Sequence, residues 1–412
     1  MCRGSFVKWQ GNKMKVTKSI LTALLLFLAA GFCFSACGSS SEKEKESSDS
    51  EFIQEVSDVT GKKICAAYIA TWGVYDPVKK KERPWTASDI DGERLTDLIL
   101  SFAEVNDGNH VSLNTDEVEQ YYDQVAALVK KYPHLRVSVA IGGASDGVED
   151  FKALVADSSK MTAFVQNVRA LLSSNKNIRG IDIDWEYPGK RLKSGSEAWE
   201  QEFSGYISLL SSLRSMMDQL KKTNGISYRL TTALPADNNP IVSHIKRICD
   251  VCDGVNLMMY DYSGAWSSRT GHNAPLSVVC NDTLDFIENN ADPSKLILGI
   301  PFYGQRWTNV EDGGNHGLGS NVGSSSDDCG FEYSKIIPLL SDAGYEKYTD
   351  GEDGPYLYSP SKKIFISYTG PQEVSVLTEF ALKNSLGGVM TWEYGQDMTG
   401  ILLKAMSEGI WK

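Results

Sequence analysis

The stretch "RGIDIDWEYP", residues 179–188, carries an acidic side chain at every second position. Side chains alternate between the two faces of a β-strand, so its three acids would share one face. These acids are Asp182, Asp184 and Glu186. The two isoleucines and the tryptophan between them would share the opposite face. An acidic face in water would make this an ordinary surface strand, so its meaning depends on the fold around it.

Eight short apolar runs of β-strand character alternate with helix-like stretches from Lys62 onward. The runs span residues 64–72, 95–105, 135–143, 178–187, 228–235, 254–262, 295–304 and 387–394. Strands that alternate with helices form parallel sheets through right-handed crossovers, and eight of them close into a barrel. A doubly wound open sheet is the alternative, but no Gly-x-Gly-x-x-Gly follows the first run. We therefore predict an α/β protein with a (β/α)8 TIM barrel over residues 62–408.

In a closed barrel, the acidic face of run 178–187 would point into the interior, where an unpaired charge is costly. Side chains two residues apart on a strand are separated by roughly 6.5 to 7 Å, which is close enough to share a proton. We expect Asp182 and Asp184 to hold one proton between them. Glu186 would lie at the mouth of the barrel, where burial and like charge raise the pKa of a carboxyl and suit it to general acid catalysis at neutral pH.

The connection between the seventh and eighth runs is too long for a single crossover helix. Residues 305–370 carry their own β-like patterns and the glycine-rich stretch "DGGNHGLGSNVGSSS". The glycine spacing matches no phosphate-binding loop, so we interpret this stretch as a surface loop. The whole segment is predicted to be a small α+β subdomain inserted between strands seven and eight. Insertions at the carboxyl ends of barrel strands form the walls of active sites.

The amino-terminal region has the layout of a secretory signal, with lysines, an apolar run over residues 19–36 and then Cys37. The tetrapeptide "FSAC" that ends at Cys37 is similar to a bacterial lipobox, whose cysteine is acylated. We predict a signal peptide over residues 1–36, lipidation of Cys37 and a disordered tether over 37–61. The domain would lie outside the cytoplasm, anchored to the cell envelope by the lipid. The outer-membrane surface is one location that fits this prediction. An uncleaved membrane anchor is the alternative.

Charge and cysteine content narrow the classes of function. With 53 acidic and 41 basic residues the formal net charge is −12, which disfavours a nucleic-acid partner because such binding needs clustered cations. The spacing of Cys249 and Cys252 is that of a zinc or redox pair, but no second pair or histidine cluster completes a site. We expect no metal and no cofactor. The remaining cysteines beyond the amino-terminal region are Cys65, Cys280 and Cys329.

Six segments of the chain, taken together, resemble one known family. Besides "IDIDWEYP" (181–188), they are "VSVAIGG" (137–143), "NLMMYDY" (256–262), "GHNAPL" (271–276), "LGIPFYG" (298–304) and "GGVMTWEYGQD" (387–397). The first resembles the Asp-x-Asp-x-Glu signature of glycoside hydrolase family 18, the chitinase-like barrels, and the others fall in that family's order. The resemblance covers residues 62–408, and the predicted insertion resembles that of the chitinase subfamily.

The resemblance implies a role for each matched residue. Glu186 would protonate the glycosidic oxygen, and the 2-acetamido group of the substrate, not an enzyme carboxylate, would act as the nucleophile. Asp184 would orient this group and exchange a hydrogen bond with Asp182. Tyr260 would hydrogen-bond the acetamido carbonyl. The residues implied in substrate binding are Asp261, Trp392, Tyr68, Phe102, Met258, Trp185 and Tyr303.

Two departures from the family concern the side of the cleft that binds the leaving sugar. Ala144 follows Gly143 where many chitinases have an aromatic residue, and Gln305 stands where an arginine often follows Tyr-Gly. These departures favour soluble chito-oligosaccharides over crystalline chitin. The expected function is a retaining hydrolase of β-1,4-linked GlcNAc glycans that works through an oxazolinium intermediate. An endo-β-N-acetylglucosaminidase acting on N-glycan cores and a non-catalytic glycan-binding barrel are the alternatives.

Overall fold

The computed structural model describes residues 61–76, 78–106, 112–144, 147–236, 239–322, 328–351 and 353–412. The predicted signal peptide, Cys37 and all of the predicted tether except Gly61 lie outside the described residues. Within the described ranges, no helix has the length and apolar character needed to cross a membrane.

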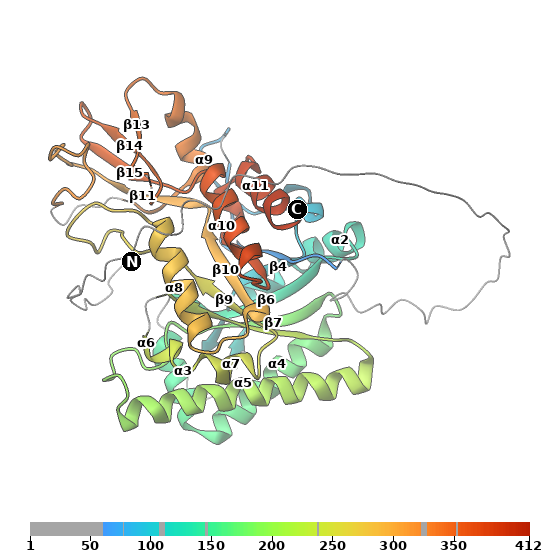
Figure 1. Cartoon of the computed structure of the whole chain (residues 1–412). Coiled ribbons are helices and arrows are strands. Elements are labelled where there is room, and N and C mark those ends of the chain that lie inside the picture. The colour runs from blue at the N-terminus through green and yellow to red at the C-terminus, as the bar shows by residue number, and fades with distance from the viewer. Residues whose placement is uncertain are drawn as a thin grey trace, which may run out of the picture. The chain divides into compact units, whose positions relative to one another are not determined.

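A closed barrel of eight parallel strands forms the core of the chain, as Figure 1 shows. Its strands are β1 (Ile64–Ala70), β4 (Asp97–Asn106), β6 (Arg136–Gly142), β7 (Ile178–Asp184), β8 (Arg229–Pro235), β9 (Gly254–Met258), β10 (Leu296–Pro301) and β16 (Gly388–Trp392). Strand β1 pairs with both β4 and β16 and so closes the barrel. All eight predicted runs contain a strand, and the predicted (β/α)8 fold is confirmed.

Strand alternation sorts side chains between the interior and the surrounding helices. Ile181 and Ile183 of β7 are fully buried in the large core outside the barrel. A smaller cluster fills the interior with residues from alternate positions of five strands, namely Ala66, Tyr68, Ile99, Ala140, Ile297 and Met390. Asp182 and Asp184 therefore point inward, since they alternate with the two isoleucines on β7.

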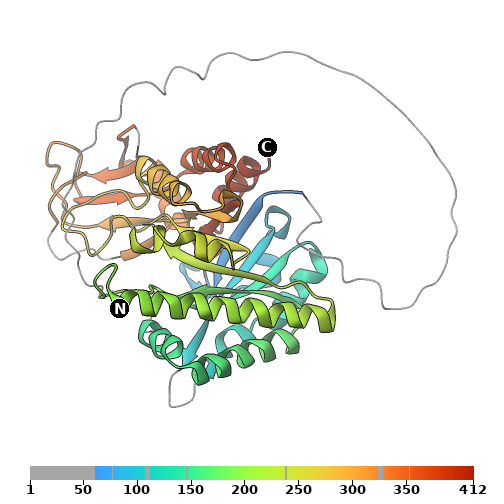
Figure 2. The same cartoon turned by 60° about the horizontal axis from the view of Figure 1, so that its bottom comes forward.

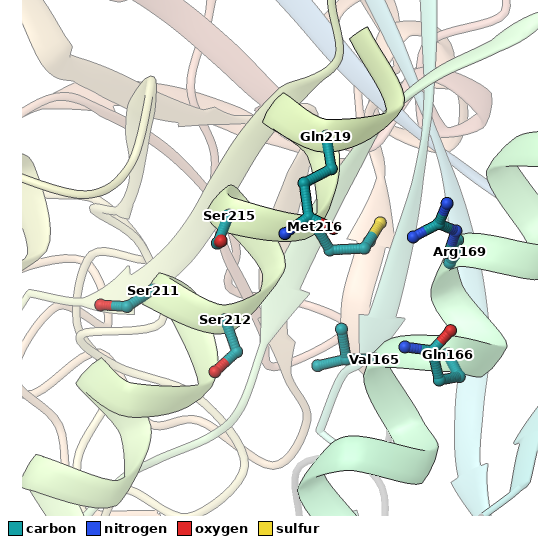
Figure 3. Close-up of a pocket in the computed structure, with 8 residues that line it drawn as sticks. All are labelled: Val165, Gln166, Arg169, Ser211, Ser212, Ser215, Met216 and Gln219. Atoms are coloured by element: carbon teal, nitrogen blue, oxygen red, sulfur yellow. The ribbon is translucent and has the colours of Figure 1, made fainter. Parts of the chain in front are cut away.

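Helices cover the outside of the barrel (Figures 1 and 2). They are α1 (Asp116–Glu119), α2 (Tyr122–Lys131), α3 (Gly147–Ala156), α4 (Ser158–Ser174), α5 (Glu197–Asn224), α6 (Asn239–Val242), α7 (Ile245–Cys249), α8 (Leu276–Glu288), α10 (Pro371–Lys383) and α11 (Ile401–Ile410). The longest, α5, begins where the Ser196 side chain accepts the Trp199 N–H and ends at Gly225 in a left-handed conformation. A groove of about 360 Å³ lies between α4 and α5 on the outside of the barrel and is lined by none of the predicted site residues (Figure 3).

Between β10 and β16 the chain forms a five-stranded antiparallel sheet. Its strands are β11 (Tyr303–Trp307), β12 (Asp328–Glu332), β13 (Glu346–Thr349), β14 (Pro355–Ser359) and β15 (Ile364–Ser367), with α9 (Tyr333–Ile336) after β12. Trp307, Tyr358 and Phe365 pack in a separate apolar cluster on this sheet. The short strands β2 (Val74–Asp76) and β3 (Lys81–Arg83) form a hairpin, and β5 (Ser112–Asn114) pairs with the end of β4. The predicted boundaries of an insertion subdomain stay a prediction.

Candidate active site

The three predicted acids lie at the carboxyl end of β7. Asp182 and Asp184 belong to the strand and are 0% and 3% exposed. The strand ends at Asp184, three residues earlier than the predicted run, so Glu186 belongs to the following loop and is half-buried. Carboxyl ends of barrel strands are where active sites of this fold are built.

Asp182 is held by a complete set of hydrogen bonds deep in the barrel. Its carboxylate accepts hydrogen bonds from the Tyr68 hydroxyl (2.8 Å), the Thr231 hydroxyl (2.5 Å) and the Asn256 amide (3.0 Å). The Asn256 amide also donates to the Tyr68 hydroxyl oxygen (2.8 Å). Burial raises the pKa of Asp182, and these hydrogen bonds act in the opposite direction. Asp182 is thus fixed in position by side chains from β1, β8 and β9.

Asp184 lies two residues nearer the mouth of the barrel, and its hydrogen bonding differs from that of Asp182. Its Oδ1 atom is buried with no hydrogen-bond partner in the described part of the chain. Burial, followed by the charges of Glu186 and Asp182, raises the pKa of Asp184 well above the usual carboxyl value. The backbone of strand β6 comes very close to Asp184 at Gly142. A Cβ atom at that position would lie 2.1 Å from the Asp184 carbonyl oxygen, so only glycine fits there. Since Asp182 already has three donors, the proton of the pair belongs on Asp184.

Glu186 has the acidity of a general acid that works near neutral pH. Burial raises its pKa to about 6, and the negative charge of Asp261 acts in the same direction. A hydrogen bond from the Tyr187 hydroxyl and the charge of Lys190 oppose that rise. A carboxyl with this pKa is partly protonated at neutral pH and can give its proton to a leaving group.

Tyr260 and Asp261 follow β9 and lie beside the acids. Tyr260 is half-buried, and burial together with the charge of Asp184 raises the pKa of its hydroxyl, which therefore stays protonated as a donor. Asp261 adopts a left-handed backbone (φ 64°), and its carboxylate accepts from the Tyr303 hydroxyl (2.7 Å) and the Gln305 amide (3.0 Å). Tyr303 is 4% exposed, so a buried hydroxyl holds the Asp261 carboxylate in place.

Aromatic rings form a surface at the carboxyl ends of β1, β4 and β16. Trp392 stacks on Phe102 with centroids 5.5 Å apart and packs on Tyr68 at 5.7 Å. Met258 is half-buried and packs against the same interior cluster. A fourth ring, Trp72, was not predicted: it is 61% exposed and lies 6.3 Å from Trp392. The structure thus brings together Trp392, Phe102, Tyr68 and Met258 and extends their surface outward.

A second exposed tryptophan was also missed. Trp266 lies in the loop after β9 and is 38% exposed. Its sequence signal was weak, since one tryptophan in a Ser- and Gly-containing loop is not distinctive. Trp72 had a stronger one, because it is the last residue of the first predicted run and so stands at the carboxyl end of β1.

The prediction that Trp185 contacts the substrate is wrong. Trp185 is 1% exposed and lies outside the barrel, where its ring stacks on Phe151 (5.4 Å) and meets Tyr206 edge-on (5.6 Å). The physical reason is the alternation of side chains, since Trp185 lies on the opposite face from Asp184. Its role is to anchor the end of β7 to α3 and α5.

The cysteines form no metal site in the described part of the chain. Cys65, Cys249 and Cys252 are buried free thiols, and Cys280 is half-buried. Among the described residues, no group of three or more His, Cys, Asp or Glu side chains is arranged to hold a metal ion.

A (β/α)8 barrel with convergent carboxyls and an aromatic surface at the ends of its strands defines a TIM-barrel glycosidase. The particular family follows from the sequence comparison: the chain belongs to the glycosyl hydrolases family 18, whose model matches residues 64–397.

Known relatives extend over most of the chain. It is 28% identical to a probable chitinase of Drosophila melanogaster, over 81% of this chain and 72% of that protein. It is also 28% identical to an endochitinase of Manduca sexta, over 83% of this chain and 64% of that protein. A family 18 chitinase of Cycas revoluta, solved in complex with (GlcNAc)3, is similar in structure with a TM-score of 0.72. That match has 25% identity and covers 84% of this chain and 99% of the other.

Proposed function

We propose that this family 18 glycosidase hydrolyses β-1,4-linked GlcNAc glycans, chitin fragments and chito-oligosaccharides, with retention at the anomeric carbon. One observation carries the proposal: Glu186, with a pKa raised to about 6, stands at the mouth beside Asp184, whose Oδ1 has no partner in the described part of the chain. The names of the relatives and the (GlcNAc)3 bound to the Cycas revoluta enzyme support this substrate class.

Glu186 is the proposed general acid. It donates its proton to the glycosidic oxygen, and the bond from that oxygen to the anomeric carbon breaks. The oxygen of the substrate's own 2-acetamido group forms the new bond to that carbon, which gives an oxazolinium ion. Glu186, now a carboxylate, takes a proton from water as the water oxygen attacks the same carbon and reopens the ring. Two displacements at one carbon return the starting configuration.

Asp184 and Tyr260 are proposed to hold the acetamido group during this attack. An acetamido N–H is the donor that the buried Asp184 carboxyl requires, and the negative charge of Asp184 would stabilise the oxazolinium cation once formed. The protonated Tyr260 hydroxyl would donate to the acetamido oxygen. When the cation forms, the Asp184 proton would pass to Asp182, whose Oδ2 accepts from only one described donor, the Tyr68 hydroxyl.

The aromatic surface and Asp261 are proposed to bind the sugars. A pyranose ring presents an apolar face of C–H bonds, which packs on aromatic rings such as Trp392, with Tyr68, Phe102 and Met258 around it. Asp261, oriented by Tyr303, would accept a hydrogen bond from a hydroxyl of the sugar at the reacting carbon.

The test is release of fluorophore from 4-methylumbelliferyl chitobioside by the purified protein. We expect turnover by wild type and loss of turnover in Glu186→Gln. Absence of turnover by wild type would overturn the proposal. In that case an N-glycan core is the next substrate to try, and tight binding of chito-oligosaccharide without cleavage would point to a glycan-binding barrel.

The matched cellobioside tests participation of the acetamido group. It has the same linkage and leaving group but carries a 2-hydroxyl, so no oxazolinium ion can form. We expect no detectable release from it, whereas comparable rates on both substrates would contradict the substrate-assisted step.

We further propose that Cys37 carries a lipid that tethers the domain to the cell envelope outside the cytoplasm. The apolar run over residues 19–36 and the tetrapeptide that ends in Cys37 support this proposal. Metabolic labelling with an azido fatty acid should mark the protein, and the label should disappear in Cys37→Ser. An unlabelled wild-type protein would contradict lipidation.

A further inference from the structure

Lys190 lies in the loop that follows β7, four residues after the proposed acid. A tight turn places it there, with its N–H bonded to the Tyr187 carbonyl oxygen (3.0 Å). Its ammonium group donates to the main-chain carbonyl oxygen of Glu186 (3.1 Å) and lies 5.3 Å from the centroid of the Tyr187 ring. The Lys190 ammonium group therefore contacts both Glu186, the proposed acid, and its neighbour Tyr187.

The charge of Lys190 is not balanced by an acidic partner within the described ranges. No ion pair involves it among the residues that the structure describes, whereas its neighbours Arg191 and Lys152 both pair with Glu149. Lys190 is half-buried, so water screens its charge only in part. A cation in that position acts on the Glu186 carboxyl and favours its ionised form.

Two carboxyl groups also face Glu186. Asp184 comes from β7 and holds its proton strongly, while Asp261 comes from the loop after β9 and its negative charge favours the protonated form of Glu186. Lys190 acts in the opposite direction and favours the carboxylate. Tyr187 connects the two groups, because its hydroxyl donates to the Glu186 carboxylate while its ring lies under the ammonium group.

We propose that Lys190 is a positioning residue that fixes the Glu186–Tyr187 segment and limits how strongly Glu186 holds its proton. The inference rests on the proposed role of Glu186 as the acid. Without the cation, burial and the negative charge of Asp261 would keep the proton on Glu186 to higher pH. Glu186 would then become a weaker acid and, after cleavage, a stronger base.

Titration of Glu186 tests the charge effect without any need for turnover. The protein labelled with [5-13C]glutamate is followed by NMR against pH, and the Glu186 signal is identified by its loss in Glu186→Gln. In Lys190→Met, which keeps the aliphatic stem, we expect the midpoint to move to higher pH. Lys190→Arg should restore the wild-type midpoint, because it restores the charge. An unchanged midpoint in Lys190→Met would overturn the proposal.

Lys193→Met is the matched control, since it removes one positive charge from an exposed position in the same loop. We expect no displacement of the Glu186 midpoint in this variant. A displacement equal to that of Lys190→Met would show that general charge, not the placement of Lys190, is responsible, and would overturn the proposal.

Activity gives a second readout in which a merely structural role behaves differently. On the chitobioside, the basic limb of kcat/KM should move to higher pH in Lys190→Met, so that the rate at pH 8 relative to the optimum rises about threefold. A loss of rate at every pH, with the limb in place, would mean a structural role only. If wild type does not turn over the substrate, the proposed function fails, while the titration still decides the role of Lys190.

Discussion

Two layers of side chains, only two residues apart along β7, differ in how their carboxyl groups are hydrogen-bonded. In the lower layer (Asp182, Tyr68, Thr231, Asn256) the carboxylate receives three hydrogen bonds. In the upper layer (Asp184, Glu186, Tyr260) the Oδ1 of Asp184 has no partner in the described part of the chain. Burial raises the pKa of both aspartates, but hydrogen bonds oppose that rise only at Asp182.

The difference separates structure from function within one strand. A buried polar group without a partner costs free energy, and a fold tolerates that cost where a ligand supplies the missing bond. The lower layer needs no ligand, because β1, β8 and β9 already satisfy it. Changes in the upper layer should therefore affect catalysis and spare stability, while changes in the lower layer should do the reverse.

Replacing Glu186 by glutamine should have the largest effect on catalysis. The amide keeps the shape of the side chain but cannot give up a proton, so kcat should fall about 1,000-fold. Binding of chito-oligosaccharide, measured by calorimetry, should persist. Loss of binding together with activity would show that the variant damages the cleft and would remove the distinction between the layers.

Asp184→Asn should lower kcat by about 100-fold, because the amide cannot stabilise the cation that forms beside it. At high pH, however, Asp184→Asn should raise the free energy of unfolding relative to wild type. The raised pKa of Asp184 means that the native state holds this proton more tightly than the unfolded state, so wild-type stability falls as pH rises above the ordinary carboxyl pKa. Asparagine cannot ionise, so the variant lacks the part of the pH-dependent loss of stability that comes from Asp184. Denaturant unfolding at pH 5 and pH 8 measures it, and an equally steep fall in the variant would contradict the assignment.

Thr231→Val tests the lower layer. The change removes the hydroxyl that donates to Asp182 and should cost about 2 kcal/mol of the free energy of unfolding. The rate should fall less than tenfold, because Asp182 keeps two donors. Thr391→Val is the matched control: the Thr391 hydroxyl is buried without a partner in the described part of the chain, so stability should stay the same or rise. Equal losses in the two variants would mean that the hydrogen bond to Asp182 contributes nothing.

The sequence predicts the lower and upper acids but not their different surroundings. Period-two alternation in run 178–187 correctly puts Asp182 and Asp184 on the inner face. Thr231 and Asn256 stand as polar residues inside the runs 228–235 and 254–262, so a signal was present. It could not be interpreted, because the register between neighbouring strands depends on the closure of the barrel and not on either strand alone.

Strand ends and loops were harder to predict for a related reason. The run 178–187 continues past the true end of β7 at Asp184, since Trp185 and Tyr187 are also large and β-like. The burial of Trp185 comes from packing on Phe151 of α3 and Tyr206 of α5, not from strand pairing. The position of Lys190 was also not predictable from strand patterns, because its hydrogen bond to the Glu186 carbonyl oxygen depends on the turn between the two residues.

Trp72→Ala should have the smallest effect and shows how far the upper layer extends. The ring is 61% exposed, and its nearest aromatic partners are Trp392 and Phe102, at 6.3 and 6.4 Å. An exposed ring beside the aromatic surface can contact only a sugar beyond the one on Trp392, so KM for a chitotetraose substrate should rise about threefold. The chitobioside is too short to reach it, and its kcat and KM should stay at wild-type values. A loss on the short substrate as large as on the long one would show that Trp72 supports Trp392 instead, and would place it within the packing of the barrel rather than on the sugar path.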